Sequence, residues 1–391
     1  MVRSLPSGLR GRRGAGDGVA AAGEGASSAG DWGAATGGSL PPAKGALPPA
    51  RDDVAEPAQA AAATGQRGDR GSPGGRPGGR SFGDRVAQGV AERRSQIVLG
   101  LDPDPARLWP RALELTRDVT GGAAERAARA VAAHCRLVIE AAGEQCLAVK
   151  PQVACFERLG SFGWAALAEV VRDAGDAGLL VIADAKRGDI DISARAYAQA
   201  FFGQTPTPFG DVAGLGADAL TVNPLLGRDS LEPFIEAARS TGGGVLALVR
   251  TSNPGAADLQ DLPLAGGGTV SEAVARLVDE LGRPGIGTAG LADVGAVTGA
   301  TAPERLEALR SAMPHAVLLL PGIGPQGGSG RDLGPAFAPG PAGGLVSASR
   351  AIVEAHERTG AAPDRRQRSD PAAAARGEAA RLRELIWGLY A

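Results

Sequence analysis

A group of charged residues follows a strongly apolar run near the middle of the chain. Residues 179–183 are continuously apolar, which is typical of a parallel strand covered on both faces. The run leads into Asp184, Lys186 and Asp189. Because side chains alternate along a strand, we expect Asp184 and Lys186 on one face, with Asp189 in a turn that opens at Gly188. The spacing predicts an ammonium group held between two carboxylates.

This pattern can supply a proton donor. A lysine between two carboxylates stays protonated, because both neighbours favour its charged form. The alternative interpretation is a set of solvated loop charges after a strand. The position favours chemistry, because a (β/α)8 barrel places its active site at the carboxyl ends of its strands.

Eight apolar runs alternate with stretches of helical periodicity, which predicts an α/β protein with a parallel sheet. The predicted strands are residues 97–102, 146–150, 179–183, 217–223, 244–252, 291–298, 316–320 and 344–350. The predicted helices are residues 82–90, 123–143, 164–174, 192–202, 232–239, 271–281, 303–313 and 382–389. The number of units favours a closed (β/α)8 TIM barrel, a single domain over residues 81–391. A doubly wound open sheet is the alternative, disfavoured because no Gly-x-Gly-x-x-Gly follows the first strand.

Residues 1–80 are mostly Gly, Ala, Pro, Ser and Arg and show no hydrophobic periodicity. Such a segment cannot bury enough apolar surface to offset its ordering entropy, so we expect a disordered extension. It lacks the apolar core of a secretory signal, and its acidic residues argue against an organelle transit peptide.

The composition restricts the classes of partner. A formal net charge of −2 over 391 residues gives no basic field, so neither nucleic acid nor an anionic membrane is expected as a partner. No run reaches the roughly 18 apolar residues that a membrane span needs. The three cysteines and three histidines lack the spacing of a disulfide framework or zinc site. We therefore expect no metal and a reducing, cytoplasmic location.

A barrel brings its strand ends around one opening, so polar residues far apart in the sequence are expected to converge there. These residues are Asp102, Lys150, Asp184, Lys186, Thr251, Ser252, Ser349 and Arg350, with the glycine loop 321–328. In that loop Gly322 and Gly324 let backbone N–H groups approach an anion, and Gln326 can donate a hydrogen bond. With the guanidinium fork of Arg350, the loop predicts a phosphate site. A tight glycine turn beside a surface arginine is the alternative.

The stretch 253–269 is long for a loop inside a barrel and contains several Pro and Gly residues. Loops of this length are usually functional or disordered. We predict a lid over the opening.

Residues 184–190 resemble the Asp-x-Lys-x-x-Asp signature of orotidine 5′-phosphate decarboxylase, and their Lys-Arg-Gly-Asp-Ile form is similar to the bacterial type 2 subfamily. Five other segments resemble further blocks of the family, in the family's order: residues 99–103, 149–157, 251–255, 321–324 and 347–350. The resemblance covers roughly residues 82–360, and the segment before it has no counterpart in the family.

The resemblance implies a role for each matching position. Lys186 would donate a proton to C6 of the pyrimidine, with Lys150, Asp184 and Asp189 completing a charged array. In the implied homodimer, Asp189 and Ser193 would act in the partner's site. Asp102 and Lys150 would bind the ribose, Ser252 the pyrimidine edge, and Gln326 and Arg350 the 5′-phosphate. The further substrate-binding residues would be Thr251, Gly322, Gly324 and Ser349.

The implied reaction converts orotidine 5′-phosphate to UMP and CO₂ without metal or organic cofactor. One alternative is a related Mg²⁺-dependent phosphosugar decarboxylase or aldolase with the same signature. Another is a non-catalytic phosphate-binding barrel, which the intact charged residues disfavour. An RNA-binding role for residues 1–80 is disfavoured, because acidic residues interrupt the arginines and aromatic residues are almost absent.

Overall fold

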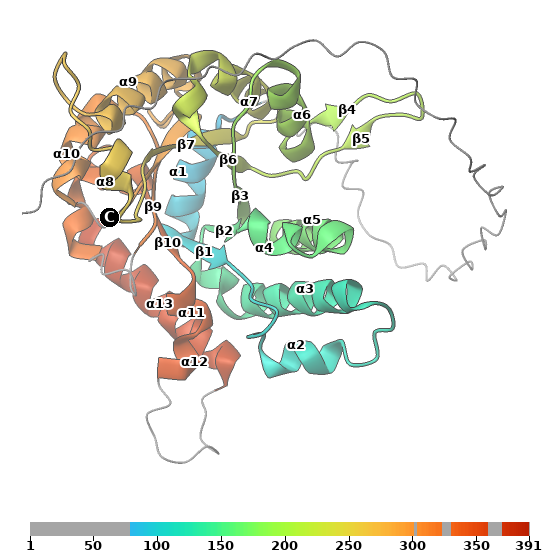
Figure 1. The fold of residues 1–391 in the computed structure, drawn as a ribbon. Helices are drawn as coiled ribbons and strands as arrows, with labels where there is room; N and C mark the ends of the chain where they lie inside the picture. Colours follow the sequence, from blue (N-terminus) through green and yellow to red (C-terminus); the bar gives the residue numbers. More distant parts are fainter. Residues whose placement is uncertain (1–78, 301–302, 323–329, 359–369, 391) are drawn as a thin grey trace, which may run out of the picture. The chain divides into compact units, whose positions relative to one another are not determined.

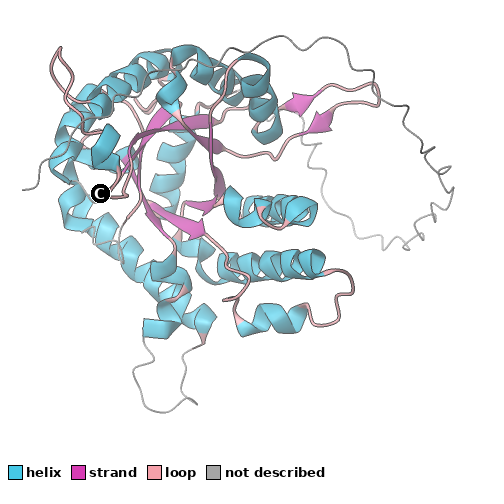
Figure 2. Cartoon of the chain, in the orientation of Figure 1, coloured by secondary structure: helices cyan, strands magenta, loops and turns pink. Residues whose placement is uncertain are grey.

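A closed barrel of eight parallel strands forms the centre of the protein (Figures 1 and 2). The computed structural model describes residues 79–300, 303–322, 330–358 and 370–390. Around the barrel the strand order is β1, β10, β9, β8, β7, β6, β3 and β2. The bounds are β1 Ile97–Leu101, β2 Ala148–Pro151, β3 Leu180–Arg187, β6 Ala219–Val222, β7 Gly244–Arg250, β8 Val294–Thr298, β9 Leu318–Leu320 and β10 Gly344–Ala348. The predicted (β/α)8 fold is confirmed, and the open sheet is wrong.

Side chains alternate between the inner and outer faces of the barrel, which produces two apolar layers. Side chains such as Val98, Ile182 and Leu246 point into the barrel and pack with Phe82 and Val86. Phe82 and Val86 belong to helix α1 (Phe82–Arg93), and the first residues of this helix contact the amino ends of the strands. Helix α1 therefore closes that end, and Figure 1 shows it through the ring of strands. The opposite, carboxyl-terminal end is left for the site.

Helices cover the outer face of the barrel (Figure 2) and bury the outward-facing strand residues. After α1 they are α2 Pro110–Leu115, α3 Ala123–Ala142, α4 Val153–Glu157, α5 Gly160–Asp176, α6 Asp191–Phe201, α7 Arg228–Ser240, α8 Ala256–Leu259, α9 Val270–Gly282, α10 Pro303–Ala312, α11 Arg350–Val353, α12 Ala355–Arg358 and α13 Pro371–Tyr390. Short 3-10 helices are η1 Gly143–Gln145, η2 Pro224–Leu226, η3 Arg283–Gly285, η4 Gly330–Phe337 and η5 Pro341–Gly343.

Several helices are longer than the sequence pattern indicated; helix α5, for example, begins at Gly160 instead of residue 164. Helix α13 begins at Pro371 instead of residue 382, and its extra turns bury Ala375 and Ala379. Alanine contributes little hydrophobic contrast, so the pattern did not reveal these turns. Helix α7 begins at Arg228 rather than residue 232, although Pro233 lies inside it.

Several features were not predicted, among them the short helices α2, α4, α11 and α12. A small antiparallel hairpin, β4 Gln204–Thr205 with β5 Val212–Ala213, lies outside the barrel between α6 and β6. The stretch 253–269 contains α8 and is fastened to the barrel, because the guanidinium of Arg250 donates to both Asp261 oxygens at 3.1 and 3.0 Å. This stretch is therefore more ordered than a plain loop, and its role as a lid stays a prediction.

Two other expectations concern the ends and the surface of the chain. Apart from Gly79 and Arg80, the extension predicted to be disordered lies outside the described residues. None of the helices in the described ranges combines the length and apolar character needed to span a membrane.

Strand β3 is irregular where its charged residues begin. Its register pairs Ala183 with Leu220 and then Arg187 with Val222, which sets a step of four residues on β3 against two on β6. Lys186 lies in this bulge with a left-handed φ of 51°. That conformation costs a non-glycine residue about 1–2 kcal/mol, so surrounding contacts must hold it.

Candidate active site

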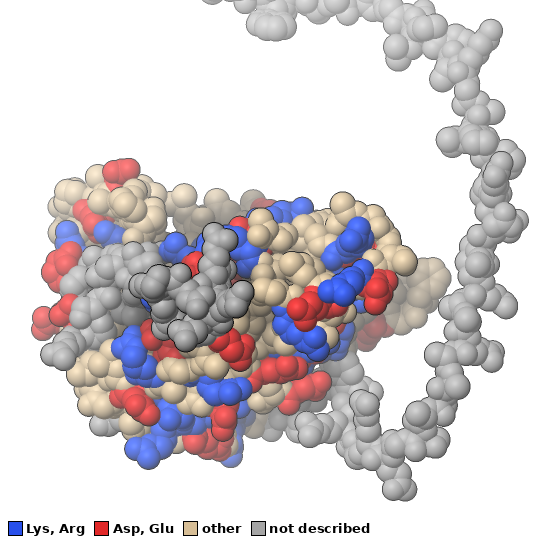
Figure 3. All heavy atoms as spheres, turned by 90° about the horizontal axis from the view of Figure 1, so that it is seen from below, with Lys and Arg blue, Asp and Glu red and all other residues tan. Residues whose placement is uncertain are grey.

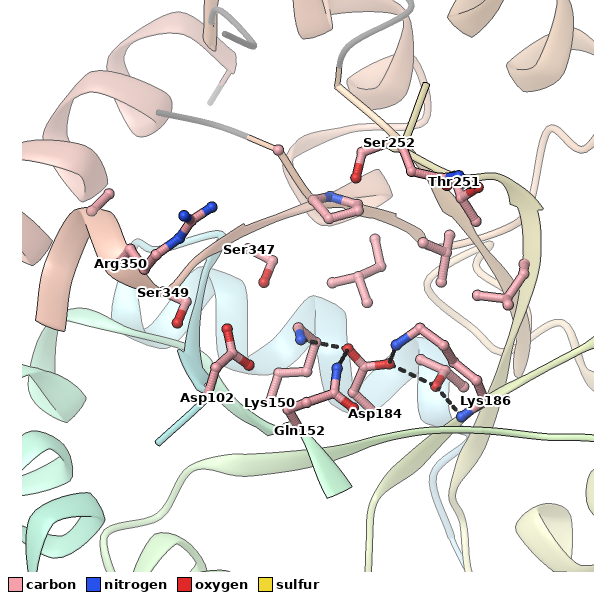
Figure 4. A pocket seen from close by; sticks show the side chains of 18 residues that line it. Asp102, Lys150, Gln152, Asp184, Lys186, Thr251, Ser252, Ser347, Ser349 and Arg350 are labelled. Carbon is pink, nitrogen blue, oxygen red and sulfur yellow. Dashed lines mark hydrogen bonds and ion pairs between the residues drawn. The ribbon is translucent and has the colours of Figure 1, made fainter. Parts of the chain in front are cut away.

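A cavity of about 450 Å³ occupies the carboxyl-terminal end of the barrel, a size typical of a small-molecule site. Figure 4 shows its walls, which come from the ends of strands all around the ring. The lining residues are Asp102, Lys150, Gln152, Asp184, Lys186, Thr221, Leu248, Thr251, Ser252, Asn253, Val297, Leu319, Pro321, Gly322, Ser347, Ser349, Arg350 and Ala351. The predicted convergence of strand ends is thus present.

The carboxylate of Asp184 lies at the centre of the polar contacts. Its Oδ2 accepts hydrogen bonds from Lys150 Nζ at 2.6 Å and from Gln152 Nε2 at 3.1 Å. Its Oδ1 accepts from Lys186 Nζ at 2.5 Å and from Thr221 Oγ1 at 3.0 Å. Two lysines on neighbouring strands therefore share one carboxylate, and two neutral donors complete its contacts (Figure 4).

Burial and charge oppose one another at this carboxylate. Asp184 is 7% exposed, and burial alone would raise its pKa. The two ammonium groups outweigh burial and lower the pKa from 3.8 to about 2. Burial likewise disfavours charged Lys150, yet Asp184 and Asp102 raise its pKa above the ordinary value. Asp184 therefore stabilises the fold above pH about 4 and loses that contribution as the pH falls towards 2.

The two lysines differ in exposure. The side chain of Lys150 is 9% exposed and that of Lys186 is 46% exposed. Both lysines line the cavity and both bind Asp184. Lys186 is the more accessible of the two.

Ser349 and Arg350 form the opposite side of the cavity (Figure 4), and Gly322 also lines the cavity. Gly322 has φ of 102°, which favours glycine. The chain also passes very close to β1 here, because a Cβ added to Gly100 would lie 2.6 Å from Ser349 Cβ. Glycine at position 100 thus allows the Ser349–Arg350 segment to approach the cavity.

Thr251 and Ser252 line the cavity at the end of β7. Thr251 is held by the start of the 253–269 stretch, since its backbone N–H donates to Gln260 Oε1 at 2.8 Å and its hydroxyl to Asn253 Oδ1 at 2.6 Å. A Cβ at Gly299 would lie 2.8 Å from Ser252 Cα, so the chain directly after β8 also passes close to this segment.

Comparison with known proteins assigns the family. Residues 95–364 match the model of the orotidine 5′-phosphate decarboxylase / HUMPS family. The chain belongs to this family. A curated orotidine 5′-phosphate decarboxylase of Rhodopirellula baltica is 44% identical over 278 residues, which are 71% of this chain and 90% of the relative. A second, from Deinococcus radiodurans, is 42% identical over 279 residues, covering 70% of this chain and 89% of the relative.

Solved structures agree with this assignment. The OMP decarboxylase of Leishmania donovani has 32% identity and a TM-score of 0.57, covering 79% of this chain and 99% of the solved one. The resemblance predicted from the signature is confirmed, and with it the enzyme class, an orotidine 5′-phosphate decarboxylase-type carboxy-lyase. The type 2 subfamily stays a prediction.

Most of the site residues predicted from the sequence line the cavity, but two of those that the structure describes do not. Asp189 is half-buried, and its Oδ1 accepts from the backbone N–H of Ile190 at 2.8 Å. Ser193 is exposed in the first turn of α6. Neither lines the cavity of its own chain. Two more predicted residues, Gly324 and Gln326, lie outside the described residues.

Sequence reasoning missed several lining residues. Gln152 and Thr221 bind Asp184, and Ser347 and Asn253 also face the cavity. Gln152 follows Lys150 by two positions, and strand alternation could have placed it on the same side. Thr221 lies within an apolar strand, where a single threonine carries no distinguishing signal. Leu248, Val297 and Leu319 supply apolar lining of the cavity. In the sequence, such residues cannot be told apart from apolar residues of the barrel core.

The described residues contain no group of three or more His, Cys, Asp and Glu side chains placed to hold a metal ion. The cysteines Cys135, Cys146 and Cys155 are unpaired. The polar groups of the cavity that the chain supplies are therefore ammonium, carboxylate, hydroxyl, amide and guanidinium groups.

Proposed function

We propose that this chain decarboxylates orotidine 5′-phosphate to UMP and CO₂, the last step of de novo pyrimidine synthesis, with Lys186 as the proton donor to C6. The observation that carries the proposal is the carboxylate of Asp184, bound by both Lys150 and Lys186 at the edge of the cavity. The arrangement supplies a fixed negative charge and a fixed proton donor 2.5 Å apart.

In the proposed mechanism the bond between C6 and the substrate carboxylate breaks and leaves its electron pair on C6. The negative charge of Asp184 disfavours the bound carboxylate, and this repulsion ends when CO₂ forms. The ammonium of Lys186 stabilises the developing charge on C6 and transfers one proton to it. Neutral Lys186 then regains a proton from water, which balances the reaction.

The two sides of the cavity suit a nucleotide. Arg350 and Ser349 lie across the cavity from Lys186 (Figure 4), so a phosphate bound by Arg350 would leave the pyrimidine near Lys186. Asp102 and Lys150 lie between these sides, as ribose ligands should, and Ser252 faces the predicted pyrimidine side. Binding energy from the phosphate and ribose would then fix C6 against the ammonium.

The alternative within the family is a Mg²⁺-dependent phosphosugar enzyme, and one assay separates the two. We expect the purified chain to consume orotidine 5′-phosphate, followed by ultraviolet absorbance, at equal rates with and without EDTA. No turnover of orotidine 5′-phosphate, or turnover abolished by EDTA and restored by Mg²⁺, would contradict the proposal.

We also propose a homodimer in which Asp189 and Ser193 complete the partner's site. Large apolar side chains next to them in the sequence face solvent, with Ile190 49% exposed and Ile192 80% exposed. Such a surface supports burial against a second copy. Further proposals are the type 2 subfamily, supported by residues 186–190, and a cytoplasmic location, which the unpaired cysteines suit.

The distribution of charged side chains on the surface also favours a small-molecule substrate over a nucleic acid. On the part of the face visible in Figure 3, Lys and Arg side chains are interspersed with Asp and Glu and form no single basic patch. Nucleic-acid partners generally bind a basic patch or stripe.

Lys186→Ala should abolish chemistry and spare binding. We expect turnover of orotidine 5′-phosphate to fall by at least about a thousandfold, because the proposed proton donor is lost. UMP binding, measured by calorimetry, should persist. Turnover within about tenfold of the unaltered protein would show that another group donates the proton.

Arg350→Ala should weaken binding of phosphorylated ligands. We expect UMP affinity to fall at least about tenfold, because a guanidinium–phosphate pair is lost, while uridine affinity stays unchanged. Arg111→Ala is the matched control, since Arg111 is an exposed arginine paired with Glu114 outside the cavity. Equal UMP affinity of Arg350→Ala and unaltered protein would place the phosphate elsewhere.

The trans role of Asp189 can be tested by mixing two inactive variants. Lys186→Ala and Asp189→Ala subunits, unfolded and refolded together, should recover about a quarter of full activity, because half of randomly formed dimers are mixed and each has one intact site. No recovery, with mixed dimers present by native mass spectrometry, would contradict action across the interface.

A further inference from the structure

Thr221 occupies a position in this site that the charged signature does not account for. It is 1% exposed on β6, and its neighbours on that strand, Ala219 inside the barrel and Leu220 outside, fix its side chain on the inner face. A hydroxyl enclosed there must be hydrogen-bonded to avoid a cost of about 1–3 kcal/mol. Its partners are both part of the charged array.

The hydroxyl of Thr221 donates one hydrogen bond and accepts another. Thr221 Oγ1 donates to Asp184 Oδ1 at 3.0 Å, and it accepts the backbone N–H of Lys186 at 3.0 Å. A hydroxyl has one proton and two lone pairs, so donating to the carboxylate leaves a lone pair for the amide. One side chain therefore fixes both the orientation of the carboxylate and the backbone of the lysine.

The contact to Lys186 substitutes for a missing strand hydrogen bond. The bulge between Ala183 and Arg187 removes Lys186 from the regular β3–β6 ladder. Its amide would otherwise be left without a ladder partner, in a residue whose φ of 51° is already strained. The threonine hydroxyl takes the place of the strand carbonyl and holds this backbone conformation.

We propose that Thr221 is a positioning residue that sets the place of the Lys186 ammonium relative to Asp184, and that the β3 bulge depends on its hydroxyl. This inference rests on the proposed role of Lys186 as proton donor. Thr221 itself transfers no proton to substrate. Its effect passes through the lysine backbone at one end and through Asp184 Oδ1 at the other.

The test compares Thr221→Val, which keeps the branched shape, with Thr221→Ser, which keeps the hydroxyl. We expect Thr221→Val to lower kcat for orotidine 5′-phosphate by about 10- to 100-fold, because displacing a reacting group by about 1 Å has an effect of that size. UMP affinity should change less than about threefold, since phosphate and ribose contacts remain. Thr221→Ser should keep kcat within about threefold of the unaltered protein.

Thr298→Val is the matched control. Thr298 is also 1% exposed on a barrel strand, β8, and its Oγ1 has no hydrogen-bond partner among the described residues. The same substitution there removes a hydroxyl without touching Asp184 or Lys186, so kcat should be unchanged. Unfolding midpoints of all variants, measured by thermal denaturation, separate a loss of fold from a loss of position.

Each outcome has one meaning for the proposal. A Thr221→Val enzyme with kcat within twofold of the unaltered protein would overturn it, as would a kcat lost equally in Thr221→Ser. Equal losses in Thr221→Val and Thr298→Val would also overturn it, because the effect would then be one of packing. Absence of orotidine 5′-phosphate turnover in the unaltered protein would instead overturn the proposed function.

Discussion

Two ammonium groups from neighbouring strands share one buried carboxylate, and the geometry of the cavity follows from that arrangement. Lys150 on β2 and Lys186 on β3 bind different oxygens of Asp184, so the carboxylate cannot turn without breaking one of the pairs. Removing a charge of this kind while its partners remain buried is costly, typically about 3–5 kcal/mol. Each of the three charged side chains, Lys150, Asp184 and Lys186, therefore depends on the others, and their contacts restrict one another's movement.

The backbone of the barrel also restricts where the residues around this charged array can lie. The β3 bulge brings Lys186 back towards Asp184 with a strained backbone. Close approaches at Gly100 and Gly299 admit the segments that carry Ser349 and Ser252. On one side of the cavity the chain provides ammonium and carboxylate, and on the other a guanidinium, so a nucleotide would bind in one direction only (Figure 4).

The sequence was informative where charge follows an apolar strand and where a family signature recurs in order. The alternation of eight apolar runs with helical stretches predicted the barrel. The two signals placed Asp102, Lys150, Asp184, Lys186 and Arg350 around its opening, and these residues do line the cavity. Periodicity could not reveal the bulge, because a register shift depends on the partner strand. It could not single out Thr221, whose role depends on a hydroxyl facing β3. It underestimated α13, where buried alanines give little contrast with solvent-facing residues.

Two ammonium groups at once hold Asp184 as a carboxylate. The most direct measurement is the titration of its side-chain carbon by NMR in protein labelled at aspartate Cγ, with Asp184→Asn identifying the signal. We expect a midpoint near 2, well below the ordinary 3.8. Lys150→Met and Lys186→Met should each move the midpoint upwards, because each removes one favourable charge. A midpoint at 3.8, or one that neither substitution moves, would show that the two ammonium groups do not hold the carboxylate.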